Sequence, residues 1–475
     1  MKAGNLFLIS GLTFLVTSGF KQKNQSEQTK KMNVIYILAD DLGYGDLGCY
    51  GQQKIKTPNI DRMARNGMLF TQNYAGCTVS APSRASLMTG LHTGHTQIRG
   101  NEEIDPEGQQ PMTPDTYTLG KLMKSAGYAT GIFGKWGLGF PGSKSEPNDM
   151  GFDEFYGYNC QRQAHSYYPD HLWHNKEKVT LKENENNGRQ IYSQDLIHQH
   201  AIQFIKDNKD KPFFAMLTYT LPHAELNLPH DSIYKMYENL FDEKPYNSRN
   251  GYHPSEKPKA SFAAMVTRLD FYVGQVLDEL RALGLDKNTL VIFTSDNGPH
   301  REGGGDPDFF KSYGPLRGIK RDVYEGGIRT PMITWMPGKV QAGTKNNHII
   351  AFWDIMPTLS ELTKTKLPVQ TDGISILPTI FSKKGQKQHD YLYWEFHEDG
   401  GRQAIRQGGW KAIRQHIASG KPTFELYNLS KDLHEDKDLS AQYPEKVKEM
   451  KLLMDRARTE SKLFNFGKAE GTTIR

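Results

Sequence analysis

The chain has 475 residues, a formal net charge of +5 and a hydrophobic content of 37%. That length suits one large α/β domain with a smaller appendage, or two or three ordinary domains, and the composition excludes a disordered or fibrous protein. Lysine and arginine are scattered among nearly as many acidic residues, which argues against a nucleic-acid-binding protein. The three cysteines, Cys49, Cys77 and Cys160, can form at most one disulfide.

The N-terminus has the pattern of a signal peptide. An apolar run over residues 6–20 is followed at once by polar residues, and Ser18 and Gly19 offer small side chains for cleavage. We therefore expect residues 1–20 to be a signal peptide, residues 21–31 a flexible linker, and the mature protein to be periplasmic or secreted. The run is shorter than a spanning helix needs, but an uncleaved membrane anchor is the alternative.

Short apolar runs rich in β-branched residues predict buried strands, and helical patterns lie between them. One helical stripe includes Ile197 and Ala201, and another includes Val266 and Leu269. Strands that alternate with helices favour an α/β fold over residues 32–385, with a large, mostly parallel sheet between layers of helices. The predicted strands cover residues 33–39, 129–133, 213–219 and 290–294.

The pattern changes after residue 385, where short strands are joined by glycine-rich turns and followed by a helix. We expect a smaller C-terminal subdomain over residues 386–475, with an antiparallel sheet and one helix. The predicted strands cover residues 391–396, 404–406, 410–414 and 424–427, and the helix covers about 444–461.

Polar side chains follow each predicted strand of the large sheet. Each has an ordinary explanation as a turn or cap residue, but the carboxyl ends of parallel strands meet at one edge of a sheet, where ligands bind. The carboxylate and amide oxygens among them suit a hard cation, calcium rather than magnesium because calcium tolerates irregular geometry. These residues are Asp40 and Asp41, Lys135, His223, and Asp296 and Asn297.

Residues 80–90 place a nucleophile, a rigid turn and a cation close together. Pro82 is suited to be the first residue of a helix, so we expect Ser80 just before the helix N-terminus, where an anionic ester is favoured. Arg84 adds a positive charge one turn further on. An ordinary loop with a capping serine is the alternative.

Two more residues fit chemistry on an anion. Lys320 lies in a glycine-rich segment, where it either binds an anionic substrate or is exposed on a structural loop. His223, with an ordinary pKa near neutrality, is either the acid that protonates a departing alkoxide or a core histidine.

Taken together, these motifs resemble the type I sulfatases of the alkaline phosphatase superfamily, over nearly all of the mature chain. The matching segments occur in the family's order. They are residues 39–46, 57–61, 80–90, 134–136 and 295–298, and Lys320 with residues 325–327.

The resemblance implies that Ser80 is oxidised to formylglycine, whose hydrate is the nucleophile. A plain serine would form a slowly hydrolysed sulfate ester, whereas a geminal diol can expel sulfate. Cys77 has Val79 where the maturation motif requires proline, so it is not the modified residue. A serine-type site also implies an anaerobic radical maturation enzyme as a partner, as in bacteria.

The resemblance also assigns roles to the other site residues. It implies that Arg84 supports position 80, that Lys135 and Lys320 hold sulfate oxygens, and that His223 assists the leaving group. The implied calcium ligands are Asp40, Asp41, Ser80, Asp296 and Asn297.

The sequence departs from the family pattern at Gly137, where many relatives have a histidine that contacts the modified side chain. The role of that histidine would then fall to His92, to His300 or to an ordered water.

An aromatic and polar cluster over residues 157–175 either lines a sugar pocket or packs its aromatic rings on the main domain. With residues of the C-terminal subdomain it favours, by analogy, a sulfated carbohydrate with galactose or N-acetylgalactosamine units. A phosphoester hydrolase of the same superfamily and an inactive sulfoglycan-binding homologue are the alternatives. The predicted substrate-binding residues are Arg162, His165, His300 and Arg402.

Overall fold

The computed structural model describes residues 1, 4, 31–248 and 251–466. Most of the predicted signal peptide and most of the linker over residues 21–31 lie outside the described residues. Within the described part, no helix is both long enough and apolar enough to cross a membrane. The described residues from Met32 onward form one compact unit.

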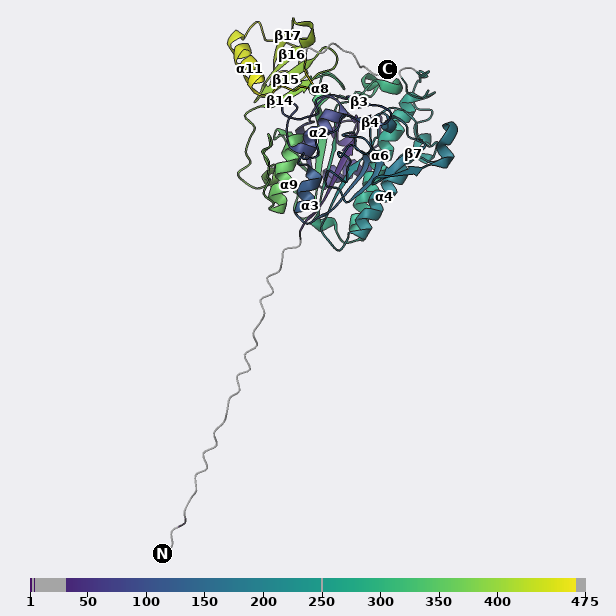
Figure 1. Cartoon of the computed structure of the whole chain (residues 1–475). Helices are drawn as coiled ribbons and strands as arrows, with labels where there is room; N and C mark the ends of the chain where they lie inside the picture. Colours follow the sequence, from purple (N-terminus) through teal and green to yellow (C-terminus); the bar gives the residue numbers. More distant parts are fainter. Residues whose placement is uncertain (2–3, 5–30, 249–250, 467–475) are drawn as a thin grey trace. The chain divides into compact units, whose positions relative to one another are not determined.

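Within the described residues, eleven strands form one large sheet, with helices on both of its faces (Figure 1). The predicted α/β fold is therefore confirmed. In spatial order the strands are β12 (Thr344–Asn346), β2 (Met68–Tyr74), β11 (Arg329–Trp335), β10 (Thr289–Ser295), β1 (Asn33–Ala39), β9 (Phe213–Thr218), β5 (Ala129–Lys135), β6 (Glu154–Tyr158), β7 (His171–His174) and β8 (Glu177–Thr180), with β13 (Ile350–Ala351) paired to β2.

The centre of the sheet is parallel. Strand β1 pairs in parallel with β10 and β9, and β5 pairs in parallel with β9 and β6. Strands β11, β7 and β8 join through antiparallel pairs toward the two edges. The parallel block thus contains all four strands that the sequence predicts, and their carboxyl ends lie at one edge.

Alternating side chains of β1 divide the core into two layers, as a strand buried on both faces requires. Ile35 and Ile37 pack with α4 (Ser193–Asp207), α6 (Pro258–Ala282) and α1 (Pro58–Arg65). Val34 and Tyr36 pack with α2 (Ser80–Thr89), α3 (Leu119–Ser125) and α9 (Ile355–Thr363). The short helices are α5 (Ser232–Lys235), α7 (Pro307–Phe310), α8 (Glu325–Ile328) and α10 (Leu377–Ile380), and a small hairpin pairs β3 (Glu103–Ile104) with β4 (Gly108–Gln109).

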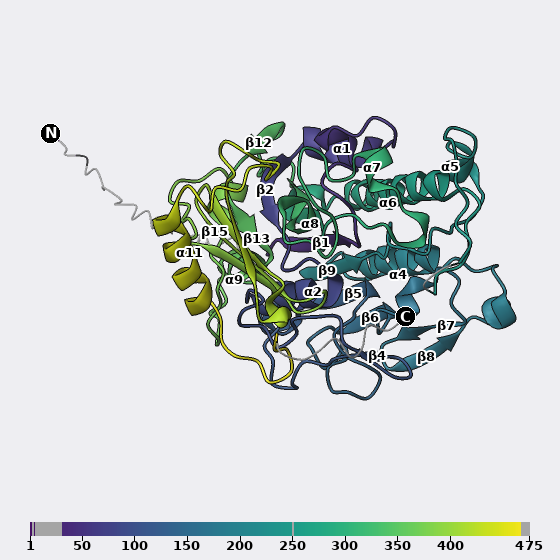
Figure 2. The ribbon, with the colours of Figure 1, turned by 90° about the horizontal axis from the view of Figure 1, so that it is seen from above.

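After α10 the chain forms a second, four-stranded antiparallel sheet with a helix, as the sequence predicts (Figure 2). Trp394 and Ile413 of this sheet pack against Tyr74 and Trp353 of the main domain. The helix ends five residues earlier than expected. The elements are β14 (Leu392–Phe396), β15 (Arg402–Gln407), β16 (Trp410–Gln415), β17 (Thr423–Asn428) and α11 (Pro444–Arg456).

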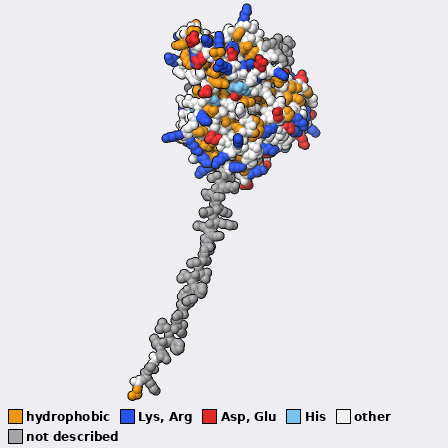
Figure 3. Space-filling view, turned by 60° about the vertical axis from the view of Figure 1, so that its left-hand side comes forward, with side chains coloured by type: hydrophobic (Ala, Val, Ile, Leu, Met, Phe, Trp, Pro, Cys, Tyr) orange, Lys and Arg blue, Asp and Glu red, His pale blue; other side chains and the backbone are white. Residues whose placement is uncertain are grey.

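Basic and acidic side chains are interspersed over the face of the molecule seen in Figure 3. Cys49, Cys77 and Cys160 are free thiols. Cys77 is fully buried, and its Sγ contacts the backbone oxygen of Glu395 in the C-terminal sheet.

Candidate functional site

The ends of four neighbouring parallel strands bring the predicted residues to one site. Asp40 and Asp41 follow β1, and the pair Asp296 and Asn297 follows β10. Lys135 is the last residue of β5, and His223 lies in the turn after β9. Because β10, β1, β9 and β5 are adjacent in this order, the parallel sheet itself assembles the cluster.

Ser80 lies at the centre of this cluster. Its hydroxyl donates a hydrogen bond to Asp40 Oδ1 at 2.9 Å and accepts one from Lys135 Nζ at 3.3 Å. Ser80 is only 2% exposed, so the hydroxyl is held in one place by buried charged groups.

The predicted start of the helix at Pro82 is wrong, because the helix begins two residues earlier. Helix α2 begins at Ser80 itself, after Val79 in an extended conformation, and Pro82 is its third residue. Proline is tolerated there because the first N–H groups of a helix have no partner within it. Gly90, in the left-handed conformation, ends the helix.

Buried ion pairs fix the charges around the hydroxyl. Lys135 Nζ lies 2.6 Å from Asp40 Oδ2, and Arg84 Nη2 lies 2.9 Å from Asp296 Oδ2 and 3.4 Å from Asp40 Oδ2. Burial alone would raise the pKa of Asp40, but Lys135, His223 and Arg84 hold it well below its usual range. Burial and the neighbouring Asp40 carboxylate instead raise the pKa of Asp296 to about 7.

The oxygen atoms beside these pairs fit a hard cation. Asp40, Asp41, Asp296 and Asn297 are completely buried. Asn297 Nδ2 donates to Asp41 Oδ1 at 2.6 Å, which leaves Asn297 Oδ1 as a buried acceptor with no partner among the described residues. Three buried carboxylates and an unpartnered amide oxygen form the ligand set that calcium or magnesium prefers.

A second group of charged side chains surrounds Asp41, which has a left-handed backbone conformation with a φ of 62°. Lys320 Nζ lies 2.9 Å from Asp41 Oδ2, 2.7 Å from Glu302 Oε2 and 3.1 Å from His223 Nε2. Lys320 is 7% exposed and His223 is 3% exposed. A buried ammonium and a buried imidazole thus lie side by side at the rim of the site.

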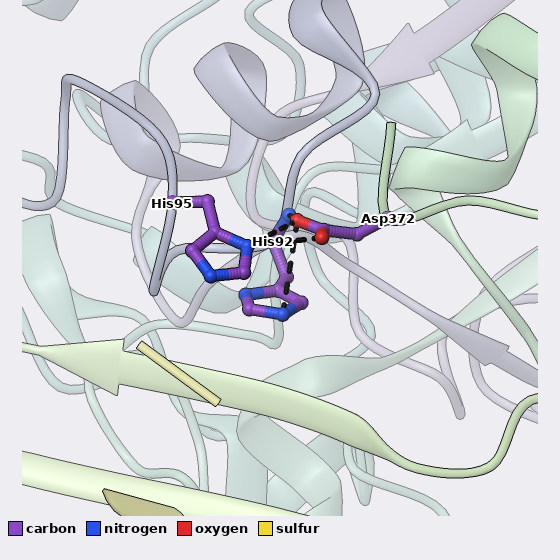
Figure 4. A group of neighbouring side chains, drawn as sticks. All are labelled: His92, His95 and Asp372. Atoms are coloured by element: carbon purple, nitrogen blue, oxygen red, sulfur yellow. Dashed lines mark hydrogen bonds and ion pairs between the residues drawn. The ribbon is translucent and has the colours of Figure 1, made fainter. Parts of the chain in front are cut away.

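His92, one of the groups considered as a replacement for the histidine missing at Gly137, forms a cluster with His95 and Asp372 (Figure 4). The His92 ring stacks on the His95 ring, with centroids 4.4 Å apart. The His92 backbone N–H and His95 Nδ1 both contact the Asp372 carboxylate. The backbone N–H of Gly94 donates to His92 Nδ1, so the neutral ring carries its proton on Nε2. This arrangement connects the loop after α2 to the segment around Asp372.

His300 is near the site, and both of its ring nitrogens have partners. Nδ1 accepts from the backbone N–H of Glu302, and Nε2 donates to the carbonyl of Pro222 at 3.1 Å. It therefore connects the turn that carries His223 to the loop that carries Glu302.

The remaining predicted substrate residues differ in their positions. The ring of His165 stacks on that of His223, with centroids 4.9 Å apart. Arg162 is paired with Glu103 and Asp105 on the surface. Arg402 contacts the backbone oxygen of Arg321, next to Lys320.

Sequence reasoning missed Glu302 and Asn101. Glu302 neutralises Lys320 and also pairs with Arg321 at 2.6 Å. Asn101 Oδ1 accepts the backbone N–H of Ala81, directly after Ser80, and the Asn101 N–H donates to Glu398 of the C-terminal subdomain. The glycines after Glu302 were a usable signal for a site loop, whereas no local pattern marks Asn101.

Comparisons with known proteins agree with this geometry. Residues 32–365 match the family model described as Sulfatase, and residues 319–460 match N-sulphoglucosamine sulphohydrolase, C-terminal. The chain is 30% identical to an N-acetylgalactosamine-6-O-sulfatase of Bacteroides thetaiotaomicron, over 95% of this chain and 98% of that protein. It is 31% identical to the N-acetylgalactosamine-6-sulfatase of Homo sapiens, over 76% and 68% of the two chains. The solved structure of Ps i-CgsB in complex with k-i-k-neocarrahexaose superposes with a TM-score of 0.75 at 29% identity, over 90% of this chain and 92% of that one.

Proposed function

Because the chain belongs to the sulfatase family, whose members hydrolyse sulfate esters, we propose that it is an exported enzyme that removes sulfate from a sulfated glycan. The proposed substrate unit is N-acetylgalactosamine or galactose with sulfate at position 6.

The buried Ser80 hydroxyl, held between Asp40 and Lys135, is the observation that carries the proposal. We propose that Ser80 is oxidised to formylglycine, whose hydrate supplies one hydroxyl to attack sulfur and a second to expel sulfate. Asp40 accepts the hydrogen bond of the attacking hydroxyl and so orients it. Lys135 Nζ contacts both this oxygen and the Asp40 carboxylate, where it balances negative charge.

Asp40, Asp41, Asp296 and Asn297, together with position 80, would hold a calcium ion, which would polarise an ester oxygen and lower the charge of the site. The charges of the protein support this role. The carboxylates of Asp40, Asp41, Asp296 and Glu302 are matched by Lys135, Lys320, Arg84 and Arg321. The protein alone is thus close to neutral here, and a divalent cation would create the net positive charge that a sulfate ester requires.

His223 is placed to assist the leaving group. Its Nδ1 donates to the carbonyl of Ala224, so its Nε2 accepts from Lys320 and faces the site. The proton that an alkoxide leaving group requires would pass through this pair of residues.

The substrate class rests on likeness to relatives. Two of them are named for N-acetylgalactosamine 6-sulfate, and the solved structure of a third contains a neocarrahexaose. Export and a radical maturation enzyme are proposed from the N-terminal pattern and from the serine at position 80.

Release of sulfate from defined sugars tests the proposal. The protein, produced together with a serine-type maturation enzyme, is assayed on the 6-sulfates and 4-sulfates of N-acetylgalactosamine and galactose, and on matching phosphate esters. We expect sulfate from the 6-sulfates and none with Ser80→Ala. Phosphate release in preference to sulfate, or sulfate release by the Ser80→Ala variant, would overturn the proposal.

A further inference from the structure

Gly137 follows Lys135 by two residues and adopts a φ of 75°, which residues with a side chain rarely adopt. The space beside it is also occupied. A Cβ atom at position 137 would lie 2.4 Å from Gln161 Nε2. A histidine at this position would therefore have a strained backbone and would require the Gln161 side chain to move.

Gln161 comes from the segment after β6, the parallel neighbour of β5. The segments after the two strands stay side by side, because the Gly137 N–H donates to the carbonyl of Asn159 at 3.0 Å. The Gln161 backbone N–H donates to Gln109 Oε1 at 3.2 Å, which fixes its main chain.

The side-chain amide of Gln161 is a buried hydrogen-bond donor without an acceptor among the described residues. The residue is 4% exposed, and its Nε2 has no hydrogen-bond partner among the described residues. Buried polar groups of native proteins are nearly always paired, so an unpaired buried donor calls for an explanation, such as a ligand or a modified side chain that it contacts. Both side-chain polar atoms of the adjacent Asn159 are unpartnered in the same way.

This amide lies at the turn that carries the nucleophile's partners. Lys135 Nζ reaches the Ser80 hydroxyl, and the Lys135 carbonyl accepts from Arg84 Nη1 at 2.8 Å. Gln161 Nε2 thus occupies the space that a side chain at position 137 would fill. This space lies two residues after Lys135, whose Nζ contacts residue 80.

We propose that Gln161 replaces the missing histidine as a positioning residue, by donating a hydrogen bond from Nε2 that holds the hydrated side chain at position 80. The inference rests on the proposed function and adds a residue to it. An amide nitrogen donates a proton in a hydrogen bond but does not accept one, so Gln161 orients the hydrate and removes no proton from it.

The test compares Gln161→Met, Gln161→His and the matched control Gln163→Met with the wild type. Gln163 lies two residues away, and its amide is already bound to the carbonyl of His171. Mass spectrometry first establishes the same aldehyde content at position 80 in each protein. The rate of labelling by an aminooxy probe, the melting temperature, and kcat and KM on a 6-sulfated sugar are then measured at several pH values.

For Gln161→Met we expect kcat to fall and labelling to accelerate, each on the order of tenfold, the effect of losing one hydrogen bond to a reacting group. KM should change little, and the melting temperature should stay the same or rise because a buried unpaired amide is gone. Gln161→His should recover part of kcat and add a pH-dependent limb near the pKa of histidine.

If Gln161→Met keeps wild-type kcat and labelling, or if Gln163→Met shows the same losses, the inference is wrong while the proposed function stands. An intact serine at position 80 in active wild-type protein would instead overturn the formylglycine mechanism, and wild-type protein with the aldehyde that releases no sulfate would overturn the proposed function.

Discussion

Lys320 Nζ lies 3.1 Å from His223 Nε2, so a buried ammonium donates a hydrogen bond to a neutral imidazole. Burial and the charge of Lys320 lower the pKa of His223 well below its usual value. In this state the proton shared by the two side chains is on Lys320. We propose that His223 Nε2 takes up this proton and passes it to the departing alkoxide. The pair, rather than the histidine alone, is the proposed acid.

Replacing His223 should therefore affect poor leaving groups most. We expect His223→Ala to lower kcat/KM on a sulfated sugar by a factor on the order of 10² to 10⁴, the usual contribution of general acid catalysis. An aryl sulfate, whose phenolate leaves without protonation, should lose much less. Equal losses on the two substrates, measured by sulfate release, would contradict the assignment.

Calcium should stabilise the fold through the carboxylate cluster. After chelation, calcium added at 100 times its dissociation constant should stabilise the protein by about 2.7 kcal/mol, seen as a higher melting temperature. Asn297→Ala should weaken this response because it removes the unpartnered amide oxygen. Wild-type protein whose melting temperature does not respond to calcium would argue against the site.

Glu395 of β14 joins the C-terminal sheet to a loop of the main domain and should make the fold sensitive to acid. Its carboxylate lies 2.9 Å from His397, 2.7 Å from Arg458 and 2.7 Å from Arg99 of the main domain. Burial alone would raise the pKa of Glu395, but these three partners hold it well below the usual range.

A lowered carboxyl pKa stabilises the fold above the ordinary glutamate value of about 4.3, and this stabilisation is lost as the pH falls below it. We expect Glu395→Gln to cost about 3 kcal/mol at pH 7, because it leaves buried cations unpaired, and to cost less as the pH falls toward 3. Denaturant unfolding at both pH values measures the difference, and a cost independent of pH would count against this ion pair.

Much of the site could be predicted because a parallel sheet brings together the residues that come directly after its strands. The positions of Asp40, Lys135 and Asp296 need only the locations of three apolar runs. The start of α2 was misplaced because Pro82 is tolerated at more than one position of a first turn.

The partners of these residues could not be predicted. Glu302 contacts Lys320 because a glycine-rich loop carries it to the site. Gln161 lies beside Gly137 because β6 is the neighbour of β5 in the sheet. Such contacts depend on the packing of distant segments, and no local periodicity records them.

The mass of the peptide that carries residue 80, from protein purified from its native host, tests the central claim most directly. We predict that Ser80 has lost two hydrogens and that the buried thiol of Cys77, whose pKa burial raises to about 12, is unmodified. A protein that releases sulfate while Ser80 remains an intact serine would contradict the account.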